Sequence, residues 1–498
     1  MKNNQSLFER AAAWLADTAR RFALPIMSVL VCGLAAHMFA FSNKLINADE
    51  TAALFSKGAT LTSGRWGLEL SKLLFPDVSM PWIYGIISLL CIAAAAAVVV
   101  DVFDIKNRLS QVLIGGSFVV FPALTGNFCY MFTSSAYALA ILLAVAAVWL
   151  FSRGGAQRNA AGCAALAISL GVYQSYIAIA ASFCVLLLIK RLMDADSTAR
   201  EVLRRGVAYL ALLIASLAIY YAVTFIVEST IDSGYQNYDV TSGDGPVKSL
   251  VTAYSAFVRT FVSGYFGYVN SVPSMVAHLV CAALIVYVLL ENLLRQKNTV
   301  KAILMLVLVI VYPLSVNCIY LIASVDIIHS LVLMSFVSFY VFTALAAERA
   351  EKGRAVRDIA SLSLICIIAS NIFFANKVYL KMYLEYENAY AYYNTLMAQI
   401  MDTPGFSQYT VVDIVGNTDT GVTHFPELDT GGFTGPNEDL VNTYTRVSFV
   451  KYYLGLDLYM YREDEILNAD WYVDMPCYPT EGSIVYREDD NRIVVKMG

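Results

Sequence analysis

Charged residues are scarce in this sequence, and their scarcity argues against an ordinary soluble domain. Only 15% of the 498 residues are Asp, Glu, Lys or Arg, whereas 58% are hydrophobic. Soluble domains have about 25% charged and about 45–50% apolar residues. Apolar runs long enough to cross a hydrocarbon core of about 30 Å recur between residues 24 and 376. The composition therefore predicts a polytopic membrane protein whose spans lie in the lipid bilayer, and the bilayer is an expected partner.

Motifs for nucleotides, zinc and disulfides are also lacking. There is no Walker or Rossmann glycine motif. Eight of the nine cysteines lie in or beside apolar runs, where Cys behaves as a small apolar residue, and no CxxC pair or Cys/His cluster suggests zinc. We expect no certain cofactor and no nucleic-acid partner. A divalent cation at the acids described below is a minor alternative, because no third carboxylate is in sight.

Eleven apolar runs are predicted to span the membrane. The fifth and sixth are short and are joined by a tight link near Tyr173 to Ser175. The predicted spans are residues 24–41, 82–101, 111–127, 135–151, 160–173, 176–189, 207–228, 273–290, 302–320, 328–346 and 359–376.

The distribution of Lys and Arg predicts the orientation. Twenty of them lie in the N-terminal segment and in the loops after even-numbered spans, and only six lie in the opposite loops. Because basic residues stay on the cytoplasmic side of short loops, we expect the N-terminus inside and the C-terminus outside. The chain is therefore expected to cross its membrane many times.

The last 122 residues, 377–498, have a different composition. They contain 8 Lys and Arg against 19 Asp and Glu, and their apolar runs are short. Strands are predicted at 409–416, 471–474, 483–486 and 492–497, the last two joined as a hairpin through "REDDN". The predicted fold is therefore an all-α polytopic membrane domain (1–376) followed by a small extracytoplasmic α+β domain (377–498).

The loop after the first span carries two adjacent acids, Asp49 and Glu50, that allow two compatible interpretations. In the structural one, Asn47 caps a short helix, Glu50 closes a capping box and Asp49 complements the helix dipole. In the functional one, a carboxylate accepts the proton of an incoming hydroxyl at the membrane surface.

Two further motifs, "TSGRWG" (62–67) and "GVYQSY" (171–176), also have structural and functional interpretations. In the structural interpretation, the glycines of the first motif form a turn and Trp66 anchors it in the membrane interface. Alternatively, Arg65 binds a phosphate and Trp66 faces a sugar or lipid. In the second motif, Tyr173 and Gln174 either join helices or face a sugar in a cavity.

Four blocks in this order resemble the bacterial Gtr type II membrane glucosyltransferases, which decorate O-antigen and belong to the GT-C superfamily. The resemblance extends over nearly the whole chain. The blocks are the acid pair with "SGRWG" and "LELSKLLF", then "NFCYMFTSSAYALA" (127–140), "LGVYQSYIAIA" (170–180) and "NIFFANKVYLKMYLEYENAYAYYNTLMAQI" (371–400). Met131 and Thr133 stand where the family has Arg and Asp, and His329 stands where an Arg is expected before the tenth span.

This resemblance implies an enzyme of the bacterial cytoplasmic membrane that moves a hexose, expected to be glucose, from undecaprenyl phosphate to a glycan such as O-antigen outside the membrane. A phosphate leaving group is already a stable anion, so one base and one cationic site suffice, and inversion is expected. This assigns Asp49 as general base, Glu50 as the residue that orients base or acceptor, and Arg65 as the phosphate ligand. Trp66, Tyr173, Gln174 and His329 are candidate substrate contacts.

Two other functions stay open at this stage. A transporter or lipid flippase usually has ionisable groups deep within its spans or repeated halves with broken helices. Here the acids cluster in an outer loop; His37 and His278 are internal to spans, while Asp101 and Glu228 lie at span ends. A related transferase acting on protein or lipid A is the other alternative. The sequence does not determine the oligomeric state.

Overall fold

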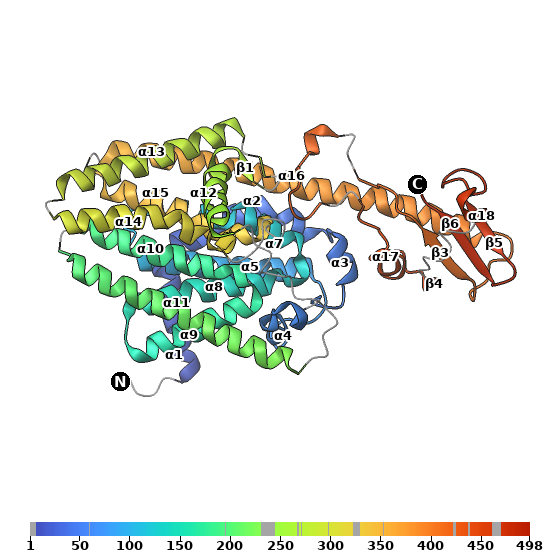
Figure 1. The fold of residues 1–498 in the computed structure, drawn as a ribbon, viewed down its shortest axis with the longest axis horizontal. Coiled ribbons are helices and arrows are strands. Elements are labelled where there is room, and N and C mark those ends of the chain that lie inside the picture. Colours follow the sequence, from blue (N-terminus) through green and yellow to red (C-terminus); the bar gives the residue numbers. More distant parts are fainter. Residues whose placement is uncertain are drawn as a thin grey trace.

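The computed structural model describes residues 6–58, 60–194, 196–230, 245–265, 268–269, 271–296, 298–321, 329–351, 353–421, 425–436, 439–460 and 470–498. It consists of a large helical bundle and a small sheet region, connected by the 49-residue helix α16 (Gly353–Met401), which leaves the bundle at one end (Figure 1). The predicted boundary at residue 376 falls within this continuous helix.

Ten segments of the described chain are helical, long and apolar enough to cross a membrane. Three of them are made of two shorter helices each. In chain order the segments are α2 (Ala23–Ser42), α5 (Pro81–Phe103), α6 with α7 (Arg108–Val119, Pro122–Cys129), α8 (Met131–Arg153), η2 with α10 (Gln174–Tyr176, Ile177–Met193), α11 (Ala199–Glu228), α13 (Val272–Arg295), α14 (Thr299–Val316), η5 with α15 (Ser330–Val337, Ser338–Arg349) and α16.

The sequence predicts eleven spans, and the difference lies at α9 (Ala156–Val172). This helix has 17 residues. At a rise of 1.5 Å per residue it is about 25 Å long, which is shorter than a hydrocarbon core of about 30 Å. Even so, α9 leads from Arg153, which pairs with Asp101 near the end of α5, to Gly171, which lies against Gly67 in the loop before α5, so it connects the two ends of the bundle as the predicted fifth span does. The tight link after it is confirmed as the turn η2.

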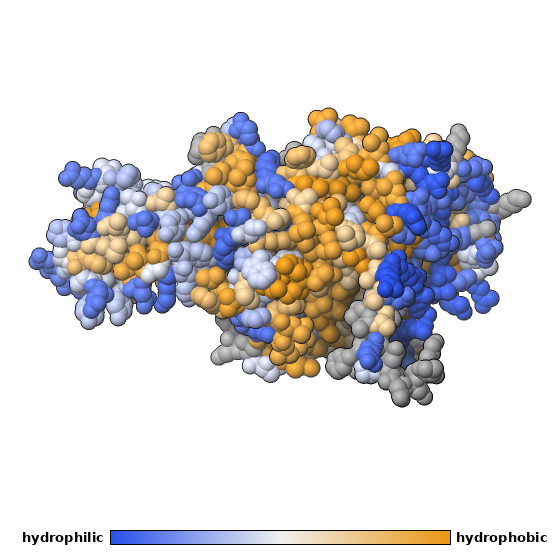
Figure 2. Space-filling model, turned by 180° about the vertical axis from the view of Figure 1, so that it is seen from behind, coloured by the Kyte–Doolittle hydropathy of each residue, from blue (hydrophilic) through white to orange (hydrophobic). Residues whose placement is uncertain are grey.

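The surface of the bundle fits a multi-pass membrane protein. Figure 2 shows a broad hydrophobic surface over the bundle, with hydrophilic residues toward both ends. Large apolar side chains on several helices point outward rather than into the core; examples are Val31, Met38, Leu90, Phe225, Ile310 and Leu362. Exposing so much apolar surface to water would be unfavourable, so this surface is suited to lipid.

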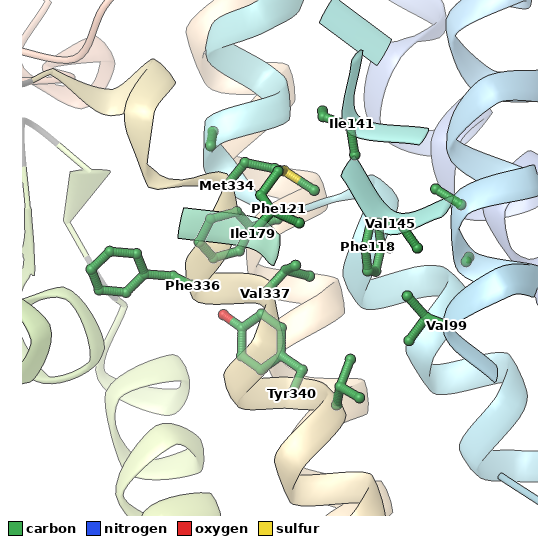
Figure 3. Packing of buried hydrophobic residues seen from close by; sticks show 14 of the residues in the cluster. Val99, Phe118, Phe121, Ile141, Val145, Ile179, Met334, Phe336, Val337 and Tyr340 are labelled. Carbon is green, nitrogen blue, oxygen red and sulfur yellow. The ribbon is translucent and has the colours of Figure 1, made fainter. Parts of the chain in front are cut away.

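The bundle core is formed where α5, α6, α8 and α10 meet the η5–α15 segment. Val99, Phe118, Val145, Ile179 and Val337 are among the buried side chains there (Figure 3). The segment made of η5 and α15 is the most enclosed of the candidate spans. A core of this density fixes the ends of the helices, and therefore the loops that carry the candidate site.

Short elements decorate the bundle. The N-terminal helix α1 (Leu7–Arg21) has a capping box between Ser6 and Glu9. After α2 come α3 (Ala48–Ala52), η1 (Leu61–Ser63) and α4 (Trp66–Ser71). Later, α12 (Pro246–Val262), the pair β1 (Gly264–Tyr265) and β2 (Tyr268–Val269), and η3 (Cys318–Leu321) pack against the second half of the bundle.

The C-terminal region contains a four-stranded sheet in the order β4-β3-β6-β5. Strand β3 (Val411–Val415) runs parallel to β4 (Tyr459–Met460) and to β6 (Arg492–Lys496), while β5 (Ile484–Arg487) pairs antiparallel with β6. The predicted hairpin is thus confirmed. The predicted strand at 471–474 is wrong: Asp470–Val473 is the helix α18, because so short an apolar run does not distinguish helix from strand. The remaining elements are η6 (Pro426–Leu428) and α17 (Arg446–Tyr452).

Candidate functional site

The acid-bearing helix α3 is anchored to the start of α8. Asn47 caps it, with Oδ1 accepting from the backbone N–H of Glu50 (2.7 Å), and its Nδ2 donates to the carbonyl of Cys129 (2.9 Å). Lys57, farther along the loop, donates to the carbonyl of Phe132 (2.7 Å). The predicted cap is confirmed, and these bonds tie the first two sequence blocks to each other.

Glu50 is fully buried and its carboxylate faces the protein. Lys44 and Ser79 donate to Oε1, and the backbone N–H of Phe132 donates to Oε2 (3.1 Å). The carboxylate therefore binds these three donors rather than turning back to close a capping box. Lys44 also donates to Ser79 (2.9 Å), which completes a small polar network under α3.

Asp49, the neighbour of Glu50, is exposed. The surrounding protein desolvates its carboxylate and thereby raises its pKa above the usual value; the positive charge of Arg65 opposes this and the charge of Glu50 adds to it. The charge of Asp49 also contributes, after burial, to raised pKa values of Tyr130 and Tyr444. Arg65 and these two tyrosines are therefore electrostatic neighbours of the accessible carboxylate.

The "GRWG" turn is a tightly packed joint. Gly64 has a φ of 68°, which favours glycine. A Cβ on Gly67 would lie 2.6 Å from the backbone of Gly171, and one on Gly171 would lie 2.6 Å from the Trp66 ring. Only glycines allow α4 and α9 to approach this closely. Because α4 is fixed against α9, Arg65, the residue just before α4, is fixed as well.

Two more side chains secure this turn. Gln174 donates from Nε2 to the carbonyl of Ser63 (2.9 Å), and Tyr220 donates to the carbonyl of Gly64 (3.2 Å). Trp66 lies stacked near Tyr220, with ring centroids 6.5 Å apart. Trp66 and Gln174 are therefore engaged in packing and hydrogen bonding that position the turn.

The guanidinium of Arg65 lies over a cluster of tyrosine rings. The guanidinium carbon is 5.3 Å from the centroid of the Tyr173 ring. That buried ring packs against Tyr137 (5.0 Å) and Tyr176 (5.3 Å). A guanidinium over a ring face is stabilised by the ring quadrupole while its N–H groups stay directed at other acceptors.

His329 lies within the electrostatic reach of Arg65. Burial, with a further contribution from the Arg65 charge, lowers the pKa of His329 to about 4, so its imidazole is neutral at neutral pH. Its Nδ1 is buried and has no hydrogen-bond partner among the described residues. A buried polar atom in that state is suited to a ligand group.

The C-terminal region covers one side of this site. Helix α17 packs against α3, with Tyr452 edge-on to Phe55 at 5.2 Å. Beside His329, the backbone N–H of Thr434 donates to Ser330 Oγ (3.3 Å), and the adjacent Phe433 packs against Phe374. The helix that carries the acids, α3, therefore lies between the bundle and α17 of the C-terminal region.

The structure thus brings Asp49, Arg65, Tyr173 and His329 to one place, and it leaves Glu50 on the protein-facing side of α3. Sequence reasoning missed Tyr130 and Tyr444. Tyr130 lies within the second block and its position there was a usable signal, whereas Tyr444 carries no local signal. Among the described residues, no group of three or more His, Cys, Asp or Glu side chains is placed to hold a metal ion.

Comparison with known proteins gives one match. A family model described as glucosyl transferase GtrII matches residues 38–347, from the end of α2 through most of α15. No curated protein and no solved structure matches the chain. The resemblance was expected to extend over nearly the whole chain, but the fourth block (371–400) lies outside the matched range. Since the match covers more than half of the chain, this protein belongs to the glucosyl transferase GtrII family.

Proposed function

We propose that this membrane glucosyltransferase transfers glucose from a polyprenyl phosphate to a hydroxyl of a surface glycan, with Asp49 as the general base. The observation that carries the proposal is the pairing of an exposed carboxylate of raised pKa with a guanidinium held by rigid packing. The undecaprenyl form of the donor, O-antigen as acceptor, a GT-C fold and the outer side of the cytoplasmic membrane are parts of the same proposal.

In the proposed reaction, the acceptor hydroxyl gives its proton to the Asp49 carboxylate as its oxygen bonds to the anomeric carbon. The bond from that carbon to the phosphate oxygen breaks at the same time, and its electron pair leaves with polyprenyl phosphate. Attack from the side opposite the phosphate inverts the anomeric centre. Asp49 then returns the proton to water. A base of raised pKa is better matched to this proton transfer than an ordinary carboxylate.

Arg65 and His329 are assigned to the donor phosphate. A guanidinium can form two parallel hydrogen bonds with phosphate oxygens, and its charge offsets that of the leaving group. The unpaired Nδ1 of His329 provides a further contact beside it. The Tyr173 ring contacts the guanidinium of Arg65 and holds it in place, while Trp66 and Gln174 fix the turn through packing and a hydrogen bond. Glu50 acts as a positioning residue through the network under α3.

Tyr130 and Tyr444 are assigned to the acceptor side. Both lie close enough to Asp49 for its charge to affect their pKa values. Tyr444 is 62% exposed, which leaves its ring free to stack on a sugar. The C-terminal region would then contribute directly to acceptor binding.

The test is an in vitro assay with purified protein, polyprenyl phosphates carrying different sugars, and candidate glycan acceptors. The proposal predicts release of polyprenyl phosphate from the glucosyl donor, dependent on acceptor, with glucose appearing in the glycan. Reconstituted protein that moves the intact sugar-lipid across the bilayer, with no release, would instead favour the flippase.

A further inference from the structure

A second polar cavity lies at the opposite end of the bundle from Asp49. It has a volume of about 420 Å³ and is formed by the last turns of α5, α8 and α10 with the first part of α11. Because α2 and α5 are connected through the Asp49 loop and pack side by side, the far end of the 23-residue α5 is about 35 Å from that loop. The volume lies within the range of ligand sites, about 300–1,000 Å³.

Positive charge is in excess around this cavity. Asp101 accepts from two guanidiniums, Arg21 (2.8 Å) and Arg153 (2.7 Å), and from Trp149 Nε1 (2.8 Å). One carboxylate thus faces two cations, which leaves one net positive charge. Lys190 adds a second, because its ammonium has no hydrogen bond or ion pair among the described residues.

The other charged groups that face the cavity are already neutralised. Asp194 pairs with Arg349 (3.1 Å) and Asp104 pairs with Lys106 (3.3 Å). Arg191, in turn, pairs with Glu201 (3.4 Å). The excess of two positive charges therefore persists after these pairs are counted, although the acids moderate the field.

A buried hydroxyl also lacks a partner here. Tyr209, on α11, is 4% exposed and lines the cavity, and its hydroxyl makes no hydrogen bond within the described residues. Arg205, one turn earlier on the same helix, donates from Nε to Glu201 (3.1 Å) and also lies near the Tyr209 hydroxyl. Buried polar atoms normally have partners, so the hydroxyl of a residue that lines the cavity is a candidate contact for a ligand.

We propose that this cavity binds the phosphate of an anionic phospholipid headgroup, with Lys190, Tyr209 and the Arg21–Arg153 pair as its ligands. Phosphate oxygens are acceptors, which suits an ammonium, a hydroxyl and guanidiniums together. Basic pockets between membrane helices bind such headgroups. Outside the cavity, α11 carries the exposed apolar residues Leu203, Val207 and Leu210, and lipid tails can lie along this helix.

The site lies on the face that carries most of the Lys and Arg residues, so the lipid would come from the leaflet opposite the proposed transfer reaction. It is independent of the glucosyl transfer chemistry. Binding there would tie the ends of four helices and the N-terminal helix α1 together. Because a ligand that binds only the folded state stabilises it, the lipid would stabilise the bundle.

The experiment titrates phosphatidylglycerol, phosphatidylcholine and inorganic phosphate into the full-length protein in a neutral detergent. Binding is read by native mass spectrometry and by the midpoint temperature of unfolding. We expect phosphatidylglycerol to bind and raise the midpoint, and phosphatidylcholine to do neither. Lys190→Gln should weaken binding about five- to tenfold, Tyr209→Phe should weaken it less, and Lys190→Arg should restore it.

The matched control is Arg204→Gln, an exposed cation on α11 that does not line the cavity. It should leave binding unchanged. Equal binding of phosphatidylglycerol and phosphatidylcholine would overturn the proposal, as would equal losses in Arg204→Gln and Lys190→Gln. Binding of inorganic phosphate that phosphatidylglycerol does not displace would overturn the lipid as its source.

Discussion

Adjacent carboxylates at positions 49 and 50 occupy opposite environments. Successive residues of a helix point about 100° apart, so α3 presents one acid to the accessible side and the other to the protein. Glu50 is fully buried with three donors, whereas Asp49 is exposed beside Arg65. The pair therefore combines one residue that anchors the loop with one whose carboxylate is accessible.

Replacement of Glu50 by Gln should destabilise the protein. The amide loses one acceptor oxygen and leaves Lys44 and Ser79 with a weaker partner, at a cost of about 1–3 kcal/mol. Thermal unfolding in detergent measures this, with Asp49→Asn as the matched control, since the exposed Asp49 should show little change. Equal stability of the two variants would contradict the assignment of Glu50.

The pH dependence of transfer should show an acid limb set by Asp49. The carboxylate acts as a base only when ionised, so activity falls as pH drops through its raised pKa. Arg65 lowers that pKa, so Arg65→Gln should move the limb to higher pH and Arg65→Lys should not. The pKa of His329 is about 4, so its imidazole is neutral above that pH and does not contribute to the acid limb there. Identical limbs in wild type and Arg65→Gln would argue against this coupling.

At the scale of elements, the "GRWG" turn shows how much of the site was predictable. Sequence patterns indicated a turn and a cation, because glycines and Arg65 are visible in isolation. The contact between Gly67 and Gly171 was not predictable, since it joins positions 104 residues apart by a close backbone approach. The cap at Asn47 was predictable because its signal is local. Tyr444 was not, because only the tertiary fold brings it to Asp49.

Replacement of Gly67 by Ala should disrupt this joint. The new Cβ would lie 2.6 Å from backbone atoms that cannot rotate away, at a cost of about 1–3 kcal/mol. Displacing α4 from α9 should also move Arg65 and reduce transfer. The control is Gly432→Ala, where the Cβ would meet nothing within 4 Å. If Gly67→Ala were as stable and as active as the control, the proposed close packing of α4 on α9 at Gly67 would be wrong.

At the scale of the whole molecule, the bundle and the C-terminal region together enclose the acids. Ile46, just before α3, is buried in the same cluster as Phe449 of α17, so the first loop contributes to the core of the C-terminal region. Composition predicted that region, and its β5–β6 hairpin, because both have local signals. Its docking onto the loop comes from long-range packing and was out of reach of the sequence.

The predicted orientation is testable without adding a cysteine. Cys477, in the C-terminal region, is the exposed cysteine among the nine, and the others are buried or partly buried. A membrane-impermeant maleimide should label intact cells, and Cys477→Ser should abolish this labelling. Labelling of Cys477 only after the membrane is permeabilised would place the C-terminal region, and with it Asp49, on the cytoplasmic side.

The most direct test of the account is the rate of glucose transfer by Asp49→Asn in the purified system with a polyprenyl-phosphate glucose donor. Loss of the base should lower the rate about 10²- to 10⁴-fold, while the protein remains folded and still binds the donor. Transfer by Asp49→Asn at the wild-type rate, from an equal amount of folded protein, would contradict the account.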